Sequence, residues 1–193
     1  MTKFILVGGY IQKGTEGGRA FAEELVKGFV EPVKILDCMF ARPPEAWQST
    51  FEADKEFFGR VLPAKKLQFV LADPDQFLAQ VAGADAIFLR GGRTDDLLKL
   101  LAHAPDWVKN LKGKTVAGTS AGADALATYF YSLDDLKLGD GLGLVSVKTI
   151  PHFRSDYNAP NIDWDKAEAE LKAYKDDLPL VTLREGEFKV FEQ

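Results

Sequence analysis

The chain has 193 residues, of which 46% are hydrophobic and 27% are charged, and its formal net charge is −5. These values are ordinary for a globular protein and exclude extended disorder. The acidic balance gives no electrostatic reason to expect nucleic acid or an anionic membrane as a partner. One cysteine, Cys38, excludes an internal disulfide and a multi-cysteine zinc site. The length predicts a single domain over residues 1–193.

The apolar run at 3–7 is predicted to be a buried strand, because Gly8 and Gly9 end it before it reaches the length of a signal-peptide core. No apolar run approaches the roughly 20 residues of a membrane-spanning helix. We therefore expect a cytoplasmic protein with no membrane partner.

Short apolar runs alternate with helical patterns along most of the chain. Strands are predicted at 3–7, 33–36, 67–71, 86–89, 115–117, 144–147, 180–182 and 189–191. Helices are predicted at 18–29, 47–60, 75–82, 94–102, 121–129 and 165–175. This alternation predicts an α/β fold with a doubly wound, mostly parallel sheet between two layers of helices.

One tight turn carries a candidate nucleophile. Ser120 lies in the pattern Gly-x-Ser-x-Gly, between a predicted strand and an alanine-rich helix. This context is typical of a nucleophile elbow, in which small residues such as Gly118 and Gly122 prevent side chains from colliding. The N–H of Ala121, directly after the serine, is a candidate oxyanion donor. The alternative interpretation is an ordinary strand–helix turn built from small residues.

A second glycine turn, Gly91-Gly92, also follows a predicted strand and begins a helix. The N–H of Gly92 is a candidate second oxyanion donor, although a turn that needs positive φ would use the same residues.

A hydroxyl nucleophile needs a general base, and the chain has two histidines. His103 is at a predicted helix end, where a positive charge is favourable in itself. His152 follows a predicted strand and is the candidate base, since an unperturbed pKa of about 6.5 suits proton transfer near neutrality. Spacing does not choose the acid that orients it, and four residues remain open: Asp134, Asp135, Asp156 and Asp163.

Together these segments resemble the family of peptidase E (aspartyl dipeptidase) and cyanophycinase. The resemblance spans the chain through Gly8-Gly9, Leu89-Arg90-Gly91-Gly92-Arg93-Thr94, Gly118-Thr119-Ser120-Ala121-Gly122-Ala123, Gly141-Leu142-Gly143-Leu144, Pro151-His152-Phe153 and Leu183-Arg184-Glu185-Gly186. It implies a flavodoxin-like fold similar to class I glutamine amidotransferase domains.

The resemblance also implies a reaction and its residues. Ser120 would be the nucleophile, His152 the base and Asp135 the triad acid, with Gly92 and Ala121 as oxyanion donors. The expected enzyme is a serine peptidase that works through an acyl-enzyme without a metal or organic cofactor. The implied substrates are small peptides, such as dipeptides with N-terminal aspartate, or cyanophycin.

Two segments depart from the family pattern. Arg93 stands where the glycine turn usually continues with asparagine, and the stretch 161–168 is acidic where the aspartyl dipeptidases have an arginine-rich helix start. Lys166, Arg154 and Arg93 are the candidate cations for a substrate carboxylate. The proline-containing loop at 37–48 either borders the site or is a surface excursion.

The same residues admit three other interpretations. An esterase of the α/β-hydrolase fold needs more chain between serine and histidine than the stretch from Ser120 to His152 provides. A glutamine amidotransferase needs cysteine at the elbow, and Cys38 is far upstream. The main alternative is a catalytically silent ligand-binding protein on the same fold.

Overall fold

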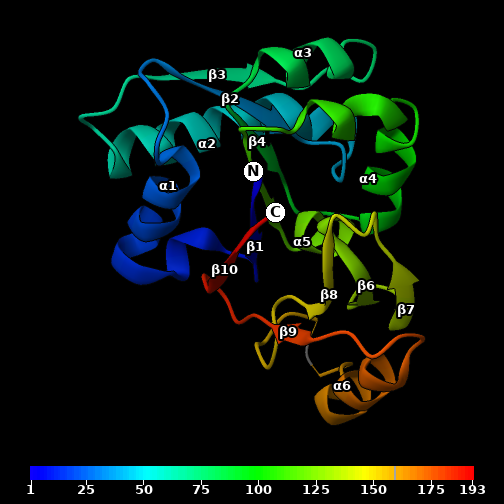
Figure 1. Cartoon of the computed structure of the whole chain (residues 1–193). Helices are drawn as coiled ribbons and strands as arrows, with labels where there is room; N and C mark the ends of the chain where they lie inside the picture. Colours follow the sequence, from blue (N-terminus) through cyan, green and yellow to red (C-terminus); the bar gives the residue numbers. More distant parts are fainter. Residues whose placement is uncertain (159) are drawn as a thin grey trace.

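The computed structural model describes residues 1–158 and 160–193, and their strands form two sheets (Figure 1). The larger sheet has six strands in the order β10-β1-β5-β4-β2-β3. These are β1 (Lys3–Val7), β2 (Val33–Cys38), β3 (Leu67–Leu71), β4 (Ala86–Leu89), β5 (Thr115–Thr119) and β10 (Phe188–Glu192). All neighbours pair in parallel except β10, which runs antiparallel to β1.

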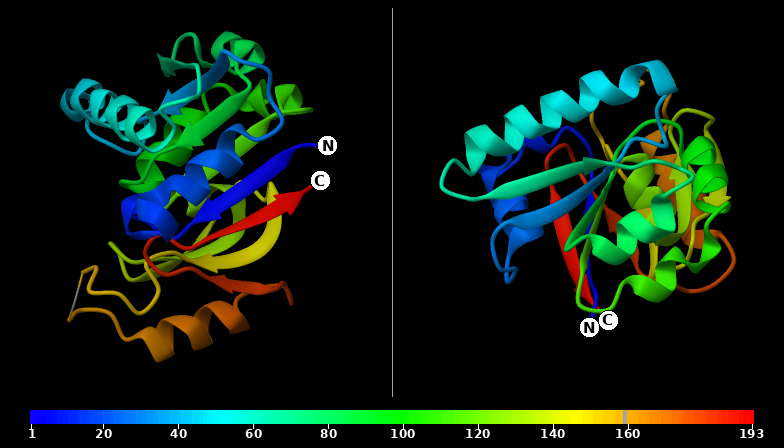
Figure 2. Two further views of the ribbon diagram at one scale, coloured as in Figure 1. Left: turned by 90° about the vertical axis from the view of Figure 1, so that its left-hand side faces the viewer. Right: turned by 90° about the horizontal axis from the view of Figure 1, so that it is seen from above.

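Helices cover both faces of the larger sheet (Figures 1 and 2). One face carries α1 (Arg19–Val26) and α2 (Trp47–Val61). The other carries α3 (Phe77–Gly83), α4 (Thr94–Leu101) and α5 (Ala121–Leu126). Short 3₁₀ turns occupy Ile11–Lys13, Thr15–Gly18, Pro44–Ala46 and Pro105–Asn110.

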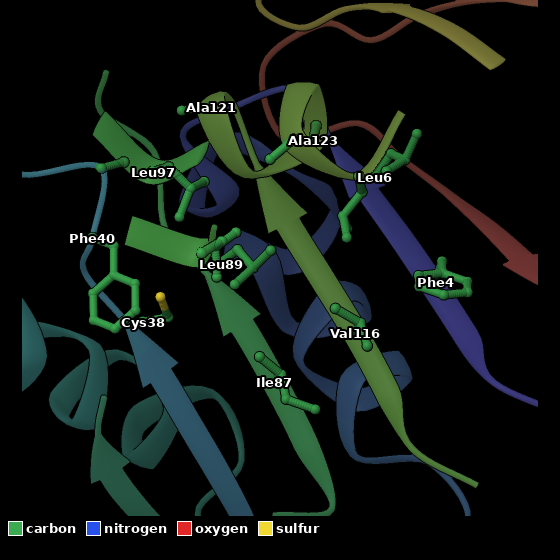
Figure 3. Close-up of a cluster of buried hydrophobic side chains, with 14 of the residues drawn as sticks. Phe4, Leu6, Cys38, Phe40, Ile87, Leu89, Leu97, Val116, Ala121 and Ala123 are labelled. Carbon is green, nitrogen blue, oxygen red and sulfur yellow. The ribbon is translucent and has the colours of Figure 1, made fainter. Parts of the chain in front are cut away.

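Alternation along the strands produces these two faces. In β1, Ile5 and Val7 are buried with the α1 and α2 side chains, whereas Phe4 and Leu6 are buried on the opposite face. Successive side chains of a strand point to opposite faces, so a continuous apolar run serves both helical layers. Figure 3 shows α5 packed over the strand ends on the second face, with Ala121 and Ala123 near Leu89.

The smaller sheet has four strands in the order β7-β6-β8-β9. They are β6 (Ala127–Ser132), β7 (Lys137–Asp140), β8 (Val145–Ile150) and β9 (Leu180–Thr182). The last helix, α6 (Trp164–Ala173), packs on this sheet through Ala167 and Leu171, which are buried with Ile150 and Phe153.

Part of this sheet differs from the sequence-based prediction. The helix predicted at 121–129 ends at Leu126, and residues from Ala127 onward form β6. Small and apolar residues lie on both sides of this junction, so periodicity does not reveal the boundary, while the Tyr-Phe-Tyr segment that follows has strand propensity. Strand β7 was not predicted. The strands predicted at 3–7, 67–71, 86–89 and 180–182 match, and the other predicted elements differ only at their ends.

A short segment joins the two sheets near the C-terminus, between β9 and β10. Its residues hydrogen-bond to the end of β1, through Gly8 N–H to Glu187 O (3.0 Å) and Gly186 N–H to Gly9 O (2.7 Å). The antiparallel pairing of β1 and β10 brings the two termini side by side (Figures 1 and 2). Among the described helices, none combines the length and the apolar character that crossing a bilayer requires.

Candidate active site

Ser120 occupies the turn between β5 and α5 with φ 53° and ψ −114°. Residues other than glycine rarely adopt this conformation, which costs on the order of 1–3 kcal/mol and persists only when the surrounding packing enforces it. That packing is close. A Cβ atom on Gly118 would collide with the carbonyl of Gly122, and one on Gly122 would collide with the carbonyl of Leu89. The small residues of the motif therefore let α5 approach the sheet and fix the strained serine.

Ser120 opens into a cavity of about 290 Å³ at the carboxyl ends of the parallel strands. His152 lines the same cavity, as do Gly91 and Gly92 of the second glycine turn. Ligand sites of open α/β sheets lie at this edge. The structure thus brings together the predicted nucleophile, the predicted base and the glycine turn.

His152 lies in the turn after β8 and is 4% exposed. Its backbone N–H donates to Gly8 O at 2.6 Å, which ties the turn to the end of β1. Gly9 lies against the imidazole, and any Cβ at this position would overlap the ring. The pair Gly8-Gly9 therefore makes room for the histidine.

The imidazole Nδ1 of His152 lies 2.9 Å from Oε1 of Glu185. A carboxylate only accepts hydrogen bonds, so this contact requires the hydrogen on Nδ1 and leaves Nε2 of the neutral ring as a proton acceptor. Both side chains are largely buried, with 5% and 11% exposure. A carboxylate at this position holds an imidazole in one tautomer and one orientation.

Glu185 reaches the histidine because it lies in the segment that joins β9 to β10. Phe153 N–H donates to Leu183 O at 2.9 Å, which holds this segment beside the turn that carries His152. The bond from Gly186 to Gly9 anchors its other side to β1. A residue 33 positions after the histidine is thus fixed next to it by backbone hydrogen bonds on both sides.

The acid predicted from the resemblance lies elsewhere. Asp135 is in the turn between β6 and β7, where its carboxylate lies 3.4 Å from Ser132 Oγ and 3.4 Å from Lys137 Nζ. Among the described residues, the carboxylate within hydrogen-bonding distance of His152 is that of Glu185. The structure therefore does not bring Asp135 to His152, because the β6–β7 hairpin turns it toward Lys137.

The other candidate acids also have their own contacts. Asp163 caps α6 by accepting from Lys166 N–H at 3.0 Å, and Asp156 is exposed. Asp134 accepts a hydrogen bond from Tyr157 Oη at 2.8 Å. This hydrogen bond links Asp134 to the histidine through the tyrosine ring.

Two tyrosines surround the imidazole of His152. Tyr157 stacks on it, with ring centroids 4.2 Å apart and planes 15° apart, and Tyr10 meets it edge-on at 5.7 Å. Burial, followed by the hydrogen bond to Asp134, raises the pKa of Tyr157 well above its ordinary value. The Tyr157 hydroxyl therefore stays protonated and acts as a donor to Asp134.

The two predicted oxyanion donors lie on either side of Ser120. Ala121 is the first residue of α5, so its N–H has no partner within the helix. Gly92 lines the cavity with φ 154°, and its Cα packs so closely on the Ala41 carbonyl that a side chain would not fit. Their part in oxyanion binding remains a prediction.

Comparisons with known proteins identify the family of this chain. The sequence profile of peptidase family S51 matches residues 48–192, which is more than half of the chain. The chain belongs to peptidase family S51. It is therefore a serine-type peptidase, a hydrolase.

Two solved structures resemble this S51 peptidase. A peptidase from an acI-B1 Actinobacterium is 23% identical with a TM-score of 0.71, and the match covers 99% of this chain and 83% of that one. A candidate peptidase E from Listeria monocytogenes EGD-e is 18% identical with a TM-score of 0.69, over 99% and 97% of the two chains. These likenesses confirm the predicted flavodoxin-like α/β fold. No curated protein matches the chain significantly.

Other predicted residues of this S51 peptidase lie outside the cavity. His103 is exposed after α4. The three cations considered for a substrate carboxylate are all exposed and face acids of their own: Arg93 with Asp96, Arg154 with Asp165, and Lys166 with Glu170.

Sequence reasoning missed Glu185, Tyr157 and Arg42 as residues of this region. Glu185 lay in the closing Leu-Arg-Glu-Gly segment of the resemblance, but nothing in its spacing tied it to His152. Arg42 lay in the proline-containing loop at 37–48, for which the sequence left two alternatives open. Because Arg42 lines the cavity, this loop borders the site.

Proposed function

We propose that this S51 peptidase hydrolyses small peptides through a triad of Ser120, His152 and Glu185. One observation carries the proposal: the strained serine and the histidine line one cavity, while Glu185 holds the histidine Nδ1 at 2.9 Å. In the expected Ser-His-Asp triad, Glu185 therefore takes the place of Asp135.

In the proposed reaction, Ser120 Oγ attacks the peptide carbonyl carbon and its proton passes to His152 Nε2. The N–H groups of Gly92 and Ala121 stabilise the negative oxygen of the tetrahedral intermediate. The C–N bond breaks, and the amine leaves with the proton from the imidazole. Water then attacks the acyl-serine ester, giving its proton to Nε2, and the acid product leaves as Ser120 Oγ regains a proton.

Glu185 has a positioning role in this scheme. It keeps the hydrogen on Nδ1, so that Nε2 is free to accept, and it stabilises the imidazolium that forms in each half-reaction.

The dimensions of the site favour short substrates. A cavity of about 290 Å³ is at the small end of the roughly 300–1,000 Å³ that ligand pockets occupy. This size supports dipeptides or similarly short peptides, and N-terminal aspartyl dipeptides are the first class to test.

A fluorophosphonate probe tests the nucleophile directly, because it phosphonylates serines that an adjacent base activates. Native protein should be labelled, and mass spectrometry should place the adduct on Ser120. Ser120→Ala and His152→Ala should not react, while circular dichroism shows that both are folded. Folded native protein that resists the probe between pH 6 and 9 would overturn the proposal and favour a silent ligand-binding protein.

A further inference from the structure

A buried ion pair adjoins the glycine turn that carries Gly92. Arg90, the residue before Gly91, has its Nε 2.9 Å from Oδ2 of Asp54 in α2. The two side chains are 16% and 6% exposed. No described residue of α2 lines the cavity, whereas Arg90 does. The ion pair therefore ties the turn to a helix that lies outside the cavity.

A second buried carboxyl, Asp37 near the end of β2, adjoins Asp54 and is fully buried. No donor among the described residues hydrogen-bonds to either of its oxygens. Burial, followed by the charge of Asp54, raises the pKa of Asp37 well above its ordinary value. Burial also raises the pKa of Asp54, but the charge of Arg90 acts to lower it. Asp37 therefore keeps its proton, and Asp54 is the carboxylate that matches the charge of Arg90.

The residues on either side of the two turn glycines are held by backbone hydrogen bonds. Arg90 N–H donates to Cys38 O at 2.9 Å, and Arg93 N–H donates to Ala41 O at 2.7 Å. In the described part of the chain, neither glycine between them donates its N–H to a backbone acceptor. Glycine has the widest conformational freedom of the residues, so the flanking residues must set the direction of these N–H groups.

Without the charge of Asp54, Arg90 would be a largely buried cation with no counterion, which is strongly unfavourable. Its guanidinium could then reach solvent through the cavity that it lines. Gly91 follows directly, and a Cβ on Gly91 would lie 3.0 Å from the Cβ of Ser120. A shift of Arg90 would therefore disturb both the serine and the N–H of Gly92.

We propose that Asp54 is a positioning residue for the reaction at Ser120 and that it acts through Arg90, which fixes the direction of the Gly92 N–H. The inference rests on the proposed function, since it concerns the oxyanion donor of that reaction. An oxyanion donor must lie about 2.7–3.1 Å from the negative oxygen, and a misplacement of about 1 Å can lower a rate on the order of 10²-fold.

The rate of fluorophosphonate labelling at Ser120 tests the role of Asp54. Asp54→Asn keeps the shape of the side chain and removes its charge, and it should slow labelling by about 10- to 100-fold. The matched control is Glu52→Gln, an exposed carboxylate of the same helix that pairs with Lys55, and its rate should stay within about twofold of native. Equal rates for Asp54→Asn and native protein would overturn the proposal.

A double-mutant cycle shows whether Asp54 acts through Arg90. Arg90→Gln should slow labelling about as much as Asp54→Asn, and the double variant should be within about twofold of Arg90→Gln alone. Arg90→Lys should keep part of the native rate, because a cation remains opposite Asp54. If the two losses multiply in the double variant, or if only Arg90→Gln slows labelling, Asp54 does not act through Arg90.

A general loss of stability is separated from positioning by Val33→Ala, which truncates a fully buried side chain in the same helical layer. Its labelling rate should stay within about twofold of native. If Val33→Ala slows labelling as much as Asp54→Asn, destabilisation explains both variants and the proposal fails.

Hydrogen exchange needs no reaction at the serine. In Asp54→Asn the amides of residues 89–94 should exchange at least about tenfold faster than in native protein and in Glu52→Gln, while the rest of the larger sheet exchanges as before. If native protein is not labelled, the proposed function fails, and this local change still shows that Asp54 holds the turn. Unchanged exchange at residues 89–94 would contradict that role whatever the labelling shows.

Discussion

The two halves of the site are held in place by different forces. Ser120 belongs to the larger sheet, where α5 packs so closely on β4 and β5 that the motif tolerates only glycine at two positions. His152 belongs to the smaller sheet, where a hydrogen bond to Glu185 and a stacked Tyr157 orient it. Steric packing therefore fixes the proposed nucleophile, and polar and aromatic contacts fix the proposed base. Substitutions in the packing around Ser120 should act mainly on stability. Those around His152 should act mainly on the rate of reaction at the serine.

The largest effect on stability is expected for Gly122→Ala. The added Cβ would meet the carbonyl of Leu89 and push α5 away from β4, which should lower the free energy of unfolding by about 2–3 kcal/mol. The matched control is Gly59→Ala, an exposed helical glycine with open space around its Cα, which should gain about 0.5–1 kcal/mol. Denaturant unfolding measures the free energy of unfolding of both variants. Equal changes in the two would contradict steric packing as the force that holds Ser120 in place.

A second test of the nucleophile half uses Asp124 in α5. It is fully buried and accepts from Thr94 Oγ1 at 3.1 Å, and burial raises its pKa well above the ordinary value. The folded protein therefore keeps a proton that the unfolded chain has released, so Asp124 makes stability fall as pH rises above about 4.

Asp124→Asn removes this titration. The unfolding free energy of the variant, relative to native protein, should increase with pH above 4, by at most about 1.4 kcal/mol per pH unit. Urea unfolding at pH 4, 5, 6 and 7 measures the difference. A relative stability that stays constant or falls over this range would show that Asp124 is ionised in the folded protein.

A smaller effect on rate is expected in the base half at Tyr157. Tyr157→Ala removes the ring stacked on His152 and should slow fluorophosphonate labelling by about tenfold or less, with stability changed little, since such aromatic contacts contribute about 0.5–1.5 kcal/mol. Tyr157→Phe keeps the ring and loses only the hydrogen bond to Asp134, so its rate should stay within about threefold of native. If both variants slow labelling equally, the hydroxyl of Tyr157, and not its stacked ring, supports the rate.

The same contrast explains what the sequence could predict. Ser120 and the glycines around it form a local motif, because the steric demands of a tight turn act on adjacent residues. His152 could be proposed as the base because only two histidines compete for the role. The strands of the larger sheet were predicted because each is a short apolar run bounded by turns.

The remaining features depend on contacts that sequence spacing does not encode. Glu185 meets His152 only because the β9–β10 segment crosses between the sheets and is hydrogen-bonded to Gly9 and Phe153. Asp135, closer in sequence and favoured by the resemblance, lies in a hairpin turn that was itself not predicted. The ion pair between Arg90 and Asp54 likewise joins the residue after β4 to α2, which lie far apart in the sequence.

The central claim is that Glu185, and not Asp135, orients the base, and one paired measurement tests it. The second-order rate of fluorophosphonate labelling at Ser120 is compared for Glu185→Gln and Asp135→Asn at pH 7.5. Glu185→Gln should slow labelling by about 10²- to 10⁴-fold, because a neutral amide no longer favours the working tautomer or the imidazolium. Asp135→Asn should remain within about threefold of native, since it loses only the contacts to Ser132 and Lys137. A large loss in Asp135→Asn together with near-native labelling of Glu185→Gln would contradict the assignment.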